Sequence, residues 1–246
     1  MTDFIRSQRK DLLRRVARNP STLLRVPEKI SDIQKWRKIN HQLDTFEASR
    51  PVSRLIQIGA NDGVRGDPLH TRIMSGRWTG VLVEPIEEHA DEARKNYSSV
   101  PGIRVVQAAI TDHNGTAEMY RFRHEDHSGV GIESHSLDLS SVKHSAKLLG
   151  VKATDEWVEK VEVPTMTLDA LITAESPEGI DLLAIDAEGS DEFILGALLE
   201  TPQRPPLILY ENLFMTKAKQ AVINDRFGNE DYTAIVTSQD TLLFRT

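Results

Sequence analysis

Short apolar runs alternate with helix-like stretches along most of this chain. Strand-like runs lie at residues 55–58, 81–83, 103–110, 180–185 and 206–210. Helical spacing or polar runs between them predict helices at 86–97, 168–172 and 192–199. This alternation predicts an α/β fold with a parallel sheet and right-handed crossovers. Two β-rich runs at 232–236 and 241–244 surround a polar turn, so they predict a C-terminal antiparallel hairpin.

The first 50 residues have a different pattern, with two predicted helices. Helical spacing predicts the first at 3–18 and the second from about Ser31 to Ala48, where Ser31 and Gln34 fit a capping box. The segment carries 12 Lys and Arg against 6 Asp and Glu. We therefore divide the chain into an N-terminal helical extension, residues 1–50, and a main domain, residues 51–246.

The least regular part of the sequence is residues 123–150. A short strand is expected before it at 116–122 and an edge strand after it at 161–164. Within it, a short helix is predicted from Ser140 to the stop at Gly150. Long irregular stretches inside compact domains are commonly lids or binding loops, so we expect this segment to border the substrate.

Composition restricts the class of protein. The 246 residues are 27% charged and 39% hydrophobic, which is typical of a soluble globular protein. There is no cysteine, which excludes disulfides and thiolate chemistry. No membrane-length apolar run or signal peptide is seen, so we expect a cytoplasmic protein. The net charge of −7 leaves −13 on the main domain after the +6 of residues 1–50, which argues against nucleic acid as a partner.

A glycine loop after the first strand of the main domain is the strongest candidate for a ligand site. The run 55–58 turns through Gly59-Ala60-Asn61-Asp62-Gly63, and Glu84 follows 21 positions after Gly63 at the end of the next strand. Such a loop permits close approach of a ligand, and such an acid accepts hydrogen bonds from ribose hydroxyls. Because G-x-G-x-x-G is absent, the loop favours a ligand with an adenosine but no pyrophosphate. S-adenosylmethionine fits that description.

Polar residues also follow the later strands, where ligands bind in open α/β sheets. Asp186, Glu211 and Asn212 offer hard oxygen ligands that suit Mg²⁺ and a substrate diol. Any one of them could instead cap a helix or hold a loop.

Methyl transfer to a hydroxyl needs a group that accepts its proton. His144, expected in the first turn of a short helix, is the first candidate for this base. The alternatives are His135, His127 and Glu188, and a solvated histidine with no catalytic role is the simplest explanation of His144.

The separated motifs together resemble a known family. Residues 55–63, 81–85, 163–169 and 182–189 look like the FkbM-type methyltransferases, over about residues 52–215. The resemblance implies a Rossmann-like class I methyltransferase fold and an S-adenosylmethionine-dependent O-methyltransferase acting on sugars, glycolipids or polyketides. It also implies that Gly59, Asn61, Asp62 and Glu84 contact the cofactor; Gly63 and Ala109 complete the candidate set. The Asp186, Glu211 and Asn212 arrangement resembles the magnesium site of catechol-type and sugar O-methyltransferases.

Two departures from the family pattern affect the expected chemistry. Ala184 stands where the family usually has a lysine, and residues 123–150 match no family motif. The acceptor is therefore expected to be a small-molecule or oligosaccharide hydroxyl of open identity.

Parts of the sequence are also consistent with two other functions. A NAD(P)-dependent oxidoreductase would use the same strand–loop start, although the missing G-x-G-x-x-G argues against it. A membrane-associated scaffold would use the basic amphipathic helix at residues 4–18, although packing on the protein itself is favoured over membrane contact. The exposed apolar faces of the N-terminal helices also favour a homodimer.

Overall fold

The protein is described by a computed structural model over residues 26–125, 131–148, 157–176 and 178–245. Its main sheet has seven strands in the order β10-β11-β9-β8-β1-β2-β3. Five of them are parallel, while β11 runs antiparallel to both β9 and β10. The strands are β1 (Ser53–Ile58), β2 (Trp78–Val83), β3 (Ile103–Val106), β8 (Leu182–Ile185), β9 (Leu207–Glu211), β10 (Thr233–Val236) and β11 (Asp240–Phe244). The expected parallel sheet and C-terminal hairpin are both confirmed.

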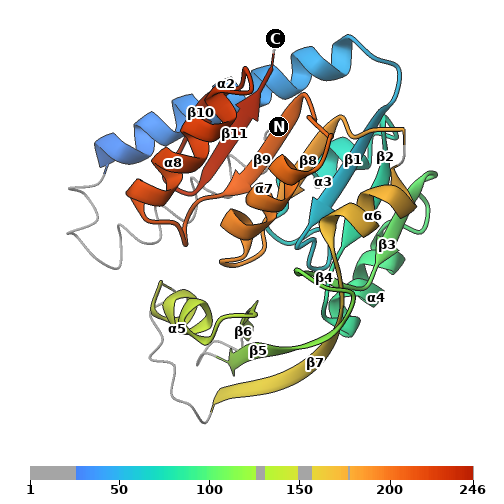
Figure 1. Cartoon of the computed structure of the whole chain (residues 1–246), viewed down its shortest axis with the longest axis vertical. Helices are drawn as coiled ribbons and strands as arrows, with labels where there is room; N and C mark the ends of the chain where they lie inside the picture. Colours follow the sequence, from blue (N-terminus) through green and yellow to red (C-terminus); the bar gives the residue numbers. More distant parts are fainter. Residues whose placement is uncertain (1–25, 126–130, 149–156, 177, 246) are drawn as a thin grey trace.

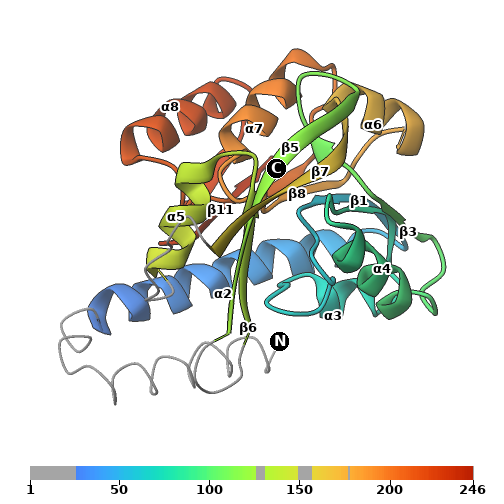
Figure 2. The same ribbon diagram turned by 90° about the horizontal axis from the view of Figure 1, so that it is seen from below.

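Helices cover both faces of this sheet, which gives three layers. Figure 2 shows α6, α7 and α8 on one side and α2, α3 and α4 on the other. Their bounds are α2 (Val26–Ala48), α3 (His70–Ile73), α4 (Glu87–Asn96), α6 (Leu168–Glu175), α7 (Asp191–Glu200) and α8 (Lys217–Gly228).

The alternation of side chains along β1 divides the core. Ile56 and Ile58 belong to the apolar cluster under α6, α7 and α8, whereas Leu55 belongs to the cluster under α2 and α3. Successive residues of a strand point to opposite faces, so a central strand buried on both faces reads as a continuous apolar run. β8 is the clearest case, because all four of its residues are buried.

A second, four-stranded sheet lies below the carboxyl ends of the parallel strands (Figure 1). Its strand order is β4-β7-β5-β6, with helix α5 packed beside β6. The elements are β4 (Ala109–Ile110), β5 (Gly115–Glu125), β6 (Gly131–Ser136), α5 (Leu139–Leu148) and β7 (Val158–Met166). Phe122, Val142 and Ala146 form a small apolar cluster that holds α5 on the sheet.

The four-stranded sheet corrects two expectations. The run 103–110 is not one strand, because β3 ends at Val106 and β4 pairs with β7 in the other sheet. The segment 123–150 is largely regular where it is described: it contains the end of β5, all of β6 and α5. The alternation of apolar and polar residues could not predict β6. Its serines and histidine are buried, but by contacts with segments that are distant in the sequence.

Helix α2 begins earlier than expected and is part of the core. It starts at Val26, so Ser31 lies inside the helix and does not cap it. Ile39 and Leu43 are fully or almost fully buried against the sheet, and Glu47 accepts hydrogen bonds from Arg72 at 2.7 Å and Trp78 at 2.8 Å. Residues 26–48 therefore pack as one layer of the main domain. The helix expected at 3–18 lies outside the described residues.

Helices α3 and α8 were not expected. α8 carried a recognisable signal: Thr216 caps it by accepting from the Lys219 amide at 3.3 Å, and Ile223 and Phe227 lie four residues apart on its buried face. Among the described helices, none is both long and apolar enough to cross a membrane.

Candidate functional site

The glycine loop lies where β1 ends and contacts the loop after β8. Gly59 has φ +79°, and a Cβ at this position would lie 1.7 Å from the Asp186 carbonyl oxygen. Only glycine combines this backbone angle with so close an approach. The loop that was expected to bind the cofactor and the loop that carries Asp186 are therefore in direct contact.

Glu84 closes the other side of the glycine loop. Its carboxylate accepts hydrogen bonds from the Asn61 amide at 2.8 Å and the Ile86 amide at 3.0 Å. The side chain is buried, and this burial raises its pKa despite both amides. The structure thus brings together the ends of β1 and β2, as the sequence predicted.

Asp62 and Asn61 are engaged mainly with their own loop. Asp62 accepts from the amides of Val64 at 2.9 Å and Arg65 at 2.8 Å, and from the Arg65 side chain at 2.5 Å. These bonds hold its pKa below the usual value although burial opposes them. Asn61 has φ +49°, and its side chain accepts from the Asp62 amide at 2.7 Å. Both residues shape the loop, and their contact with a cofactor stays a prediction.

Gly63 is held by a pair of residues that the sequence did not single out. The Tyr97 hydroxyl donates to the Gly63 carbonyl oxygen at 2.5 Å, and His70 Nδ1 lies 3.0 Å from both atoms. Tyr97 directly follows α4, and no local pattern relates it to a loop 34 positions away.

Glu188 joins the main sheet to the four-stranded sheet. Its carboxylate accepts hydrogen bonds from Ser134 and, at 3.4 Å, from Ser145, while its carbonyl oxygen accepts from Ser136 at 2.8 Å. Glu188 has φ +42°, a left-handed conformation that is uncommon for a residue with a side chain. The strained backbone is held by these hydrogen bonds from β6 and α5.

His135 is brought into the same region. It is buried, its ring meets that of His89 edge-on with centroids 5.0 Å apart, and its proximity lowers the pKa of both Glu84 and Glu188 against the effect of burial. Burial raises the pKa of Glu188, and the serines and His135 oppose that rise. His127, the other alternative base, lies outside the described residues.

His144 lies elsewhere on its helix than expected. α5 begins at Leu139, so His144 is at the middle of the helix and the proposed effect of the helix N-terminus on it is wrong. Its side chain is exposed, and its ring meets that of Phe214 edge-on at 5.8 Å. Phe214 follows β9, so His144 contacts the loop that begins after Glu211.

Acidic residues gather at the ends of β8 and β9. Burial and neighbouring carboxylates raise the pKa of Asp186 well above its usual value and that of Glu211 to about 10, and Asp186 is one of the carboxylates that act on Glu211. Asp186 is nevertheless exposed to solvent. Many protein atoms lie around its carboxylate and raise its pKa, but they leave part of the residue uncovered. Asp191 and Asp240 act on both carboxylates in the same direction.

The proposed magnesium site is not supported. Within the described residues, no group of three or more histidine, cysteine or acidic side chains is placed to hold a metal ion. Asn212 is buried, and its amide nitrogen donates to Thr241 Oγ1 at 2.9 Å, which ties β9 to the hairpin. Asn212 thus has a structural role that its position after a strand could not reveal.

Ala109 is buried in a separate apolar cluster with Ile86, Met119 and Val163. Its contact with the cofactor was predicted with residues 103–110 as one strand of the main sheet, but Ala109 belongs to β4 of the four-stranded sheet. It stays a prediction that the geometry does not favour.

The residues at the glycine loop fit a cofactor with a ribose. Each oxygen of Glu84 accepts one backbone hydrogen bond, and a carboxylate oxygen has a further lone pair that can accept from a hydroxyl. Gly59 leaves no side chain between the loop and the strand ends. The Glu84 oxygens would accept hydrogen bonds from vicinal hydroxyls, beside a loop that a ligand can approach closely.

Comparison with solved structures found similar but distant chains. The FkbM methyltransferase from Methylobacillus flagellatus KT is 11% identical with a TM-score of 0.47, and the match covers 79% of this chain and 44% of that one. The human methyltransferase 10 domain containing protein is 13% identical with a TM-score of 0.46, over 86% of this chain and 81% of that one. The METTL16 methyltransferase domain is 14% identical with a TM-score of 0.47, over 92% and 77%. This chain thus spans less than half of the Methylobacillus protein.

Sequence comparison gives the firmer result. None of the curated proteins is similar in sequence to this chain. The model of the methyltransferase FkbM domain, however, matches residues 57–235, from near the end of β1 into β10. The match contains the glycine loop, Glu84 and the acidic strand ends, on a sheet whose order and reversed β11 are those expected of a class I methyltransferase. The chain therefore belongs to the FkbM methyltransferase family.

Proposed function

We propose that the protein is an S-adenosylmethionine-dependent O-methyltransferase whose acceptor is a hydroxyl of a carbohydrate or a glycosylated small molecule. The observation that carries this proposal is the Glu84 carboxylate beside the Gly59–Gly63 loop, at the same sheet edge as the exposed Asp186. Membership of a methyltransferase family supports the reaction class. The choice of a hydroxyl acceptor comes from the resemblance of the motifs.

The cofactor would supply a methyl group on a positively charged sulfur. Glu84 would bind its ribose hydroxyls, and the Gly59–Gly63 loop would border it. Asp186 would orient the acceptor; its exposure and the contact of its backbone with Gly59 support this role. Such positioning accounts for much of the rate of an in-line displacement.

His144 would act as the base that takes the hydroxyl proton. It is exposed on α5, and its ring contacts Phe214, which lies three residues after Glu211 in the loop that follows β9. Glu188 would act as a positioning residue, because Ser134, Ser136 and Ser145 hold it between the two sheets. His135 is the alternative base, since it shares this region with Glu84 and Glu188.

Cofactor binding is the first experiment. Calorimetric titration with S-adenosylmethionine and S-adenosylhomocysteine should give saturable binding of both, while NAD(P) should give none. The variant Glu84→Gln should weaken both by about ten-fold, since one charged hydrogen-bond acceptor is lost. Absence of binding by the wild-type chain would overturn the proposal, and binding of NAD(P) alone would favour an oxidoreductase.

Methyl transfer is the second experiment. Transfer of labelled methyl groups to a panel of mono- and oligosaccharides should identify an acceptor. His144→Gln should then lower kcat by about 100-fold or more, because a positioned base contributes at least that much. His41→Gln, an exposed histidine of α2, is the matched control and should retain activity. A loss in His135→Gln with full activity in His144→Gln would transfer the role to His135.

A further inference from the structure

Four carboxylates gather at the same edge of the main sheet as the glycine loop, over the neighbouring strands. Asp186 follows β8, Asp191 begins α7, and Glu211 ends β9. β11 is antiparallel to β9, and this register places Asp240, its first residue, beside Glu211. The sheet order puts these residues over β8, β9 and β11, whereas the glycine loop and Glu84 lie over β1 and β2.

The carboxylate cluster, formed by Asp186, Asp191, Glu211 and Asp240, has no described counter-charge. No lysine, arginine or histidine in the described part of the chain forms an ion pair with any of its members. Like charges this close raise one another's pKa, and they do so for Asp186, Glu211 and Asp240. Groups perturbed in this way concentrate at functional sites.

A second observation shows that the cluster has unused binding capacity. Asp191 is only 2% exposed, and within the described residues its Oδ1 has no hydrogen-bond partner, nor does Oε2 of Glu211. A buried carboxylate oxygen without a partner is costly, so a missing donor is expected nearby. The charge of Asp191 raises the pKa of all three other members, so its carboxylate lies near theirs.

The group that completes these carboxylates could be a metal ion or a hydrogen-bond donor such as an ammonium group. A metal ion needs several oxygens within about 2.6 Å of a single point, and no described group of acidic or histidine residues meets that demand. A primary ammonium group has three donors and reaches carboxylates at about 2.8 Å in separate directions. One or two of these carboxylates can hold an ammonium group while water accepts from its remaining N–H donors, so an ammonium group does not need the three converging side chains that a metal ion needs.

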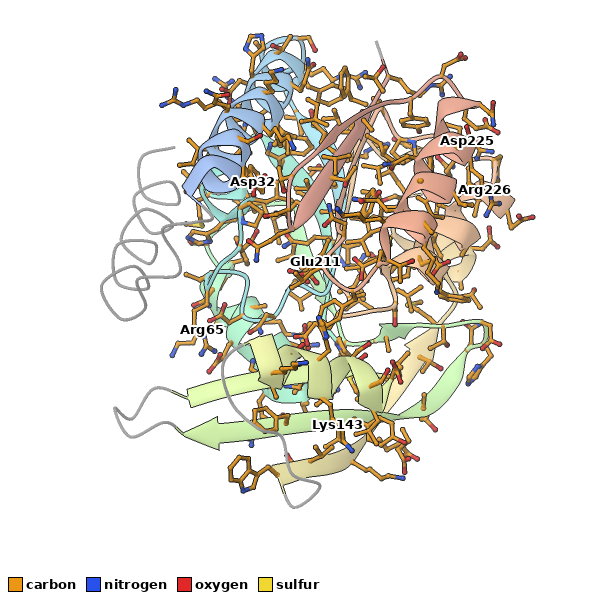
Figure 3. All side chains as sticks on the ribbon, turned by 90° about the vertical axis from the view of Figure 1, so that its left-hand side faces the viewer. Asp32, Arg65, Lys143, Glu211, Asp225 and Arg226 are labelled. Carbon is orange, nitrogen blue, oxygen red and sulfur yellow. The ribbon has the colours of Figure 1, made fainter. Side chains whose placement is uncertain are left out.

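We propose that the carboxylate cluster binds an ammonium group of the acceptor, so that the substrates of this enzyme are amino-bearing hydroxyl compounds such as amino sugars. The inference rests on the proposed function, because it assigns the β8–β9–β11 half of the site to the acceptor. Asp186 is the solvent-exposed member and gives access, while Asp191 lies at the buried end. Figure 3 shows Glu211 at the edge of the main sheet that faces the four-stranded sheet and α5, the helix that carries Lys143.

The test compares a cationic sugar with a neutral one of similar shape. D-glucosamine and N-acetyl-D-glucosamine are titrated calorimetrically into the full chain saturated with S-adenosylhomocysteine. Glucosamine should bind at least about ten-fold more tightly, and more weakly as salt is added, because charge pairing drives the difference. Equal affinity of the two sugars, or no binding of either, would overturn the inference.

Two variants locate the binding. Asp191→Asn should weaken glucosamine by about ten-fold or more without changing N-acetylglucosamine, and Asp240→Asn provides the same test at a second member. Asp225→Asn is the matched control: it removes the same charge from an exposed position on α8, far from Glu211 in Figure 3, and should leave affinity unchanged. If the Asp191 and Asp225 variants behave alike, the cluster is not the ammonium site.

Cofactor titrations separate this inference from the proposed function. If S-adenosylhomocysteine binds normally while glucosamine is not preferred, only the inference fails. If the wild-type chain does not bind S-adenosylhomocysteine, the proposed function fails. A fall in cofactor affinity in Asp191→Asn, or Mg²⁺ binding that Asp191→Asn abolishes without any preference for glucosamine, would assign the cluster to another ligand and overturn the inference.

Discussion

The Tyr97 hydroxyl donates a hydrogen bond to the Gly63 carbonyl oxygen at 2.5 Å. This contact joins the end of α4 to the last residue of the glycine loop, and His70 Nδ1 approaches the same two atoms at 3.0 Å. Burial and Asp67 raise the pKa of Tyr97, so the hydroxyl keeps its proton as a donor. The loop is therefore fixed before any ligand arrives.

Replacing Tyr97 with phenylalanine should weaken cofactor binding by several-fold. The change removes the donor to the Gly63 carbonyl and should also lower the free energy of unfolding by about 1–2 kcal/mol. Calorimetric titration of S-adenosylhomocysteine and chemical unfolding measure the two effects. His41→Gln, far along α2, serves as the unaffected reference, and an unchanged affinity in Tyr97→Phe would show that loop and ligand are independent.

Adding a methyl group at Gly59 should be far more damaging than at Gly66. Both residues have positive φ, +79° and +76°, so alanine meets similar backbone strain at each. At Gly59 the new Cβ would lie 1.7 Å from the Asp186 carbonyl oxygen, whereas at Gly66 it meets nothing within 4 Å. Gly66→Ala should cost about 1 kcal/mol, and Gly59→Ala should cost several times more or prevent folding.

Thermal unfolding of the two glycine variants provides the measurement. If Gly59→Ala melts at the temperature of Gly66→Ala, the close contact between the glycine loop and Asp186 is wrong. If Gly59→Ala does not fold, the susceptibility of the two variants to proteolysis is compared. Rapid cleavage of Gly59→Ala alone attributes the loss to the contact with Asp186, because the two positions share the same backbone strain.

Removing the Ser136 hydroxyl should loosen the attachment of the four-stranded sheet. Ser136 donates to the Glu188 carbonyl at 2.8 Å, and Glu188 is held in a left-handed conformation. Ser136→Ala should lower the free energy of unfolding by about 1 kcal/mol and speed amide exchange in β6 and α5. Ser75→Ala loses a hydroxyl that bonds only within its own exposed turn, and should change neither measurement.

The main sheet could be predicted because its strands are buried on both faces and read as continuous apolar runs. β8 is wholly buried, and Ile185 runs directly into Asp186, so both the strand and the polar residue at its end were visible in the sequence. The same argument located Glu84. Each of these inferences needed only local pattern and the rule that parallel strands end at one edge.

Other parts of the site depend on contacts between distant segments. Tyr97 reaches Gly63 across 34 positions, and Ser134 and Ser136 reach Glu188 across more than 50. Asp191 was not singled out in the sequence, because nothing local indicates that Glu211 and Asp240 lie near it. Hydrogen bonds of this kind follow from tertiary packing, which side-chain periodicity does not encode.

The raised pKa of Glu211 makes stability depend on pH. Burial and the carboxylates of Asp186, Asp191 and Asp240 raise it from 4.5 to about 10, so the folded protein holds a proton that the unfolded chain releases. The stabilisation from this proton is fully present below the ordinary pKa and is lost as pH rises through the folded value. The stability of the wild-type chain should therefore fall across the range from about 4.5 to about 10.

Glu211→Gln should remove this part of the pH dependence, because glutamine resembles the protonated acid and cannot ionise. Near pH 5, where Glu211 is protonated in the fold, the variant and the wild type should melt at similar temperatures; near pH 9 the variant should be the more stable. Thermal unfolding across this range, with Asp225→Asn as a control that keeps the wild-type profile, measures the difference. A melting difference that is the same at both pH values would show that Glu211 ionises as an ordinary surface carboxylate, and the mutual repulsion within the carboxylate cluster would then be wrong.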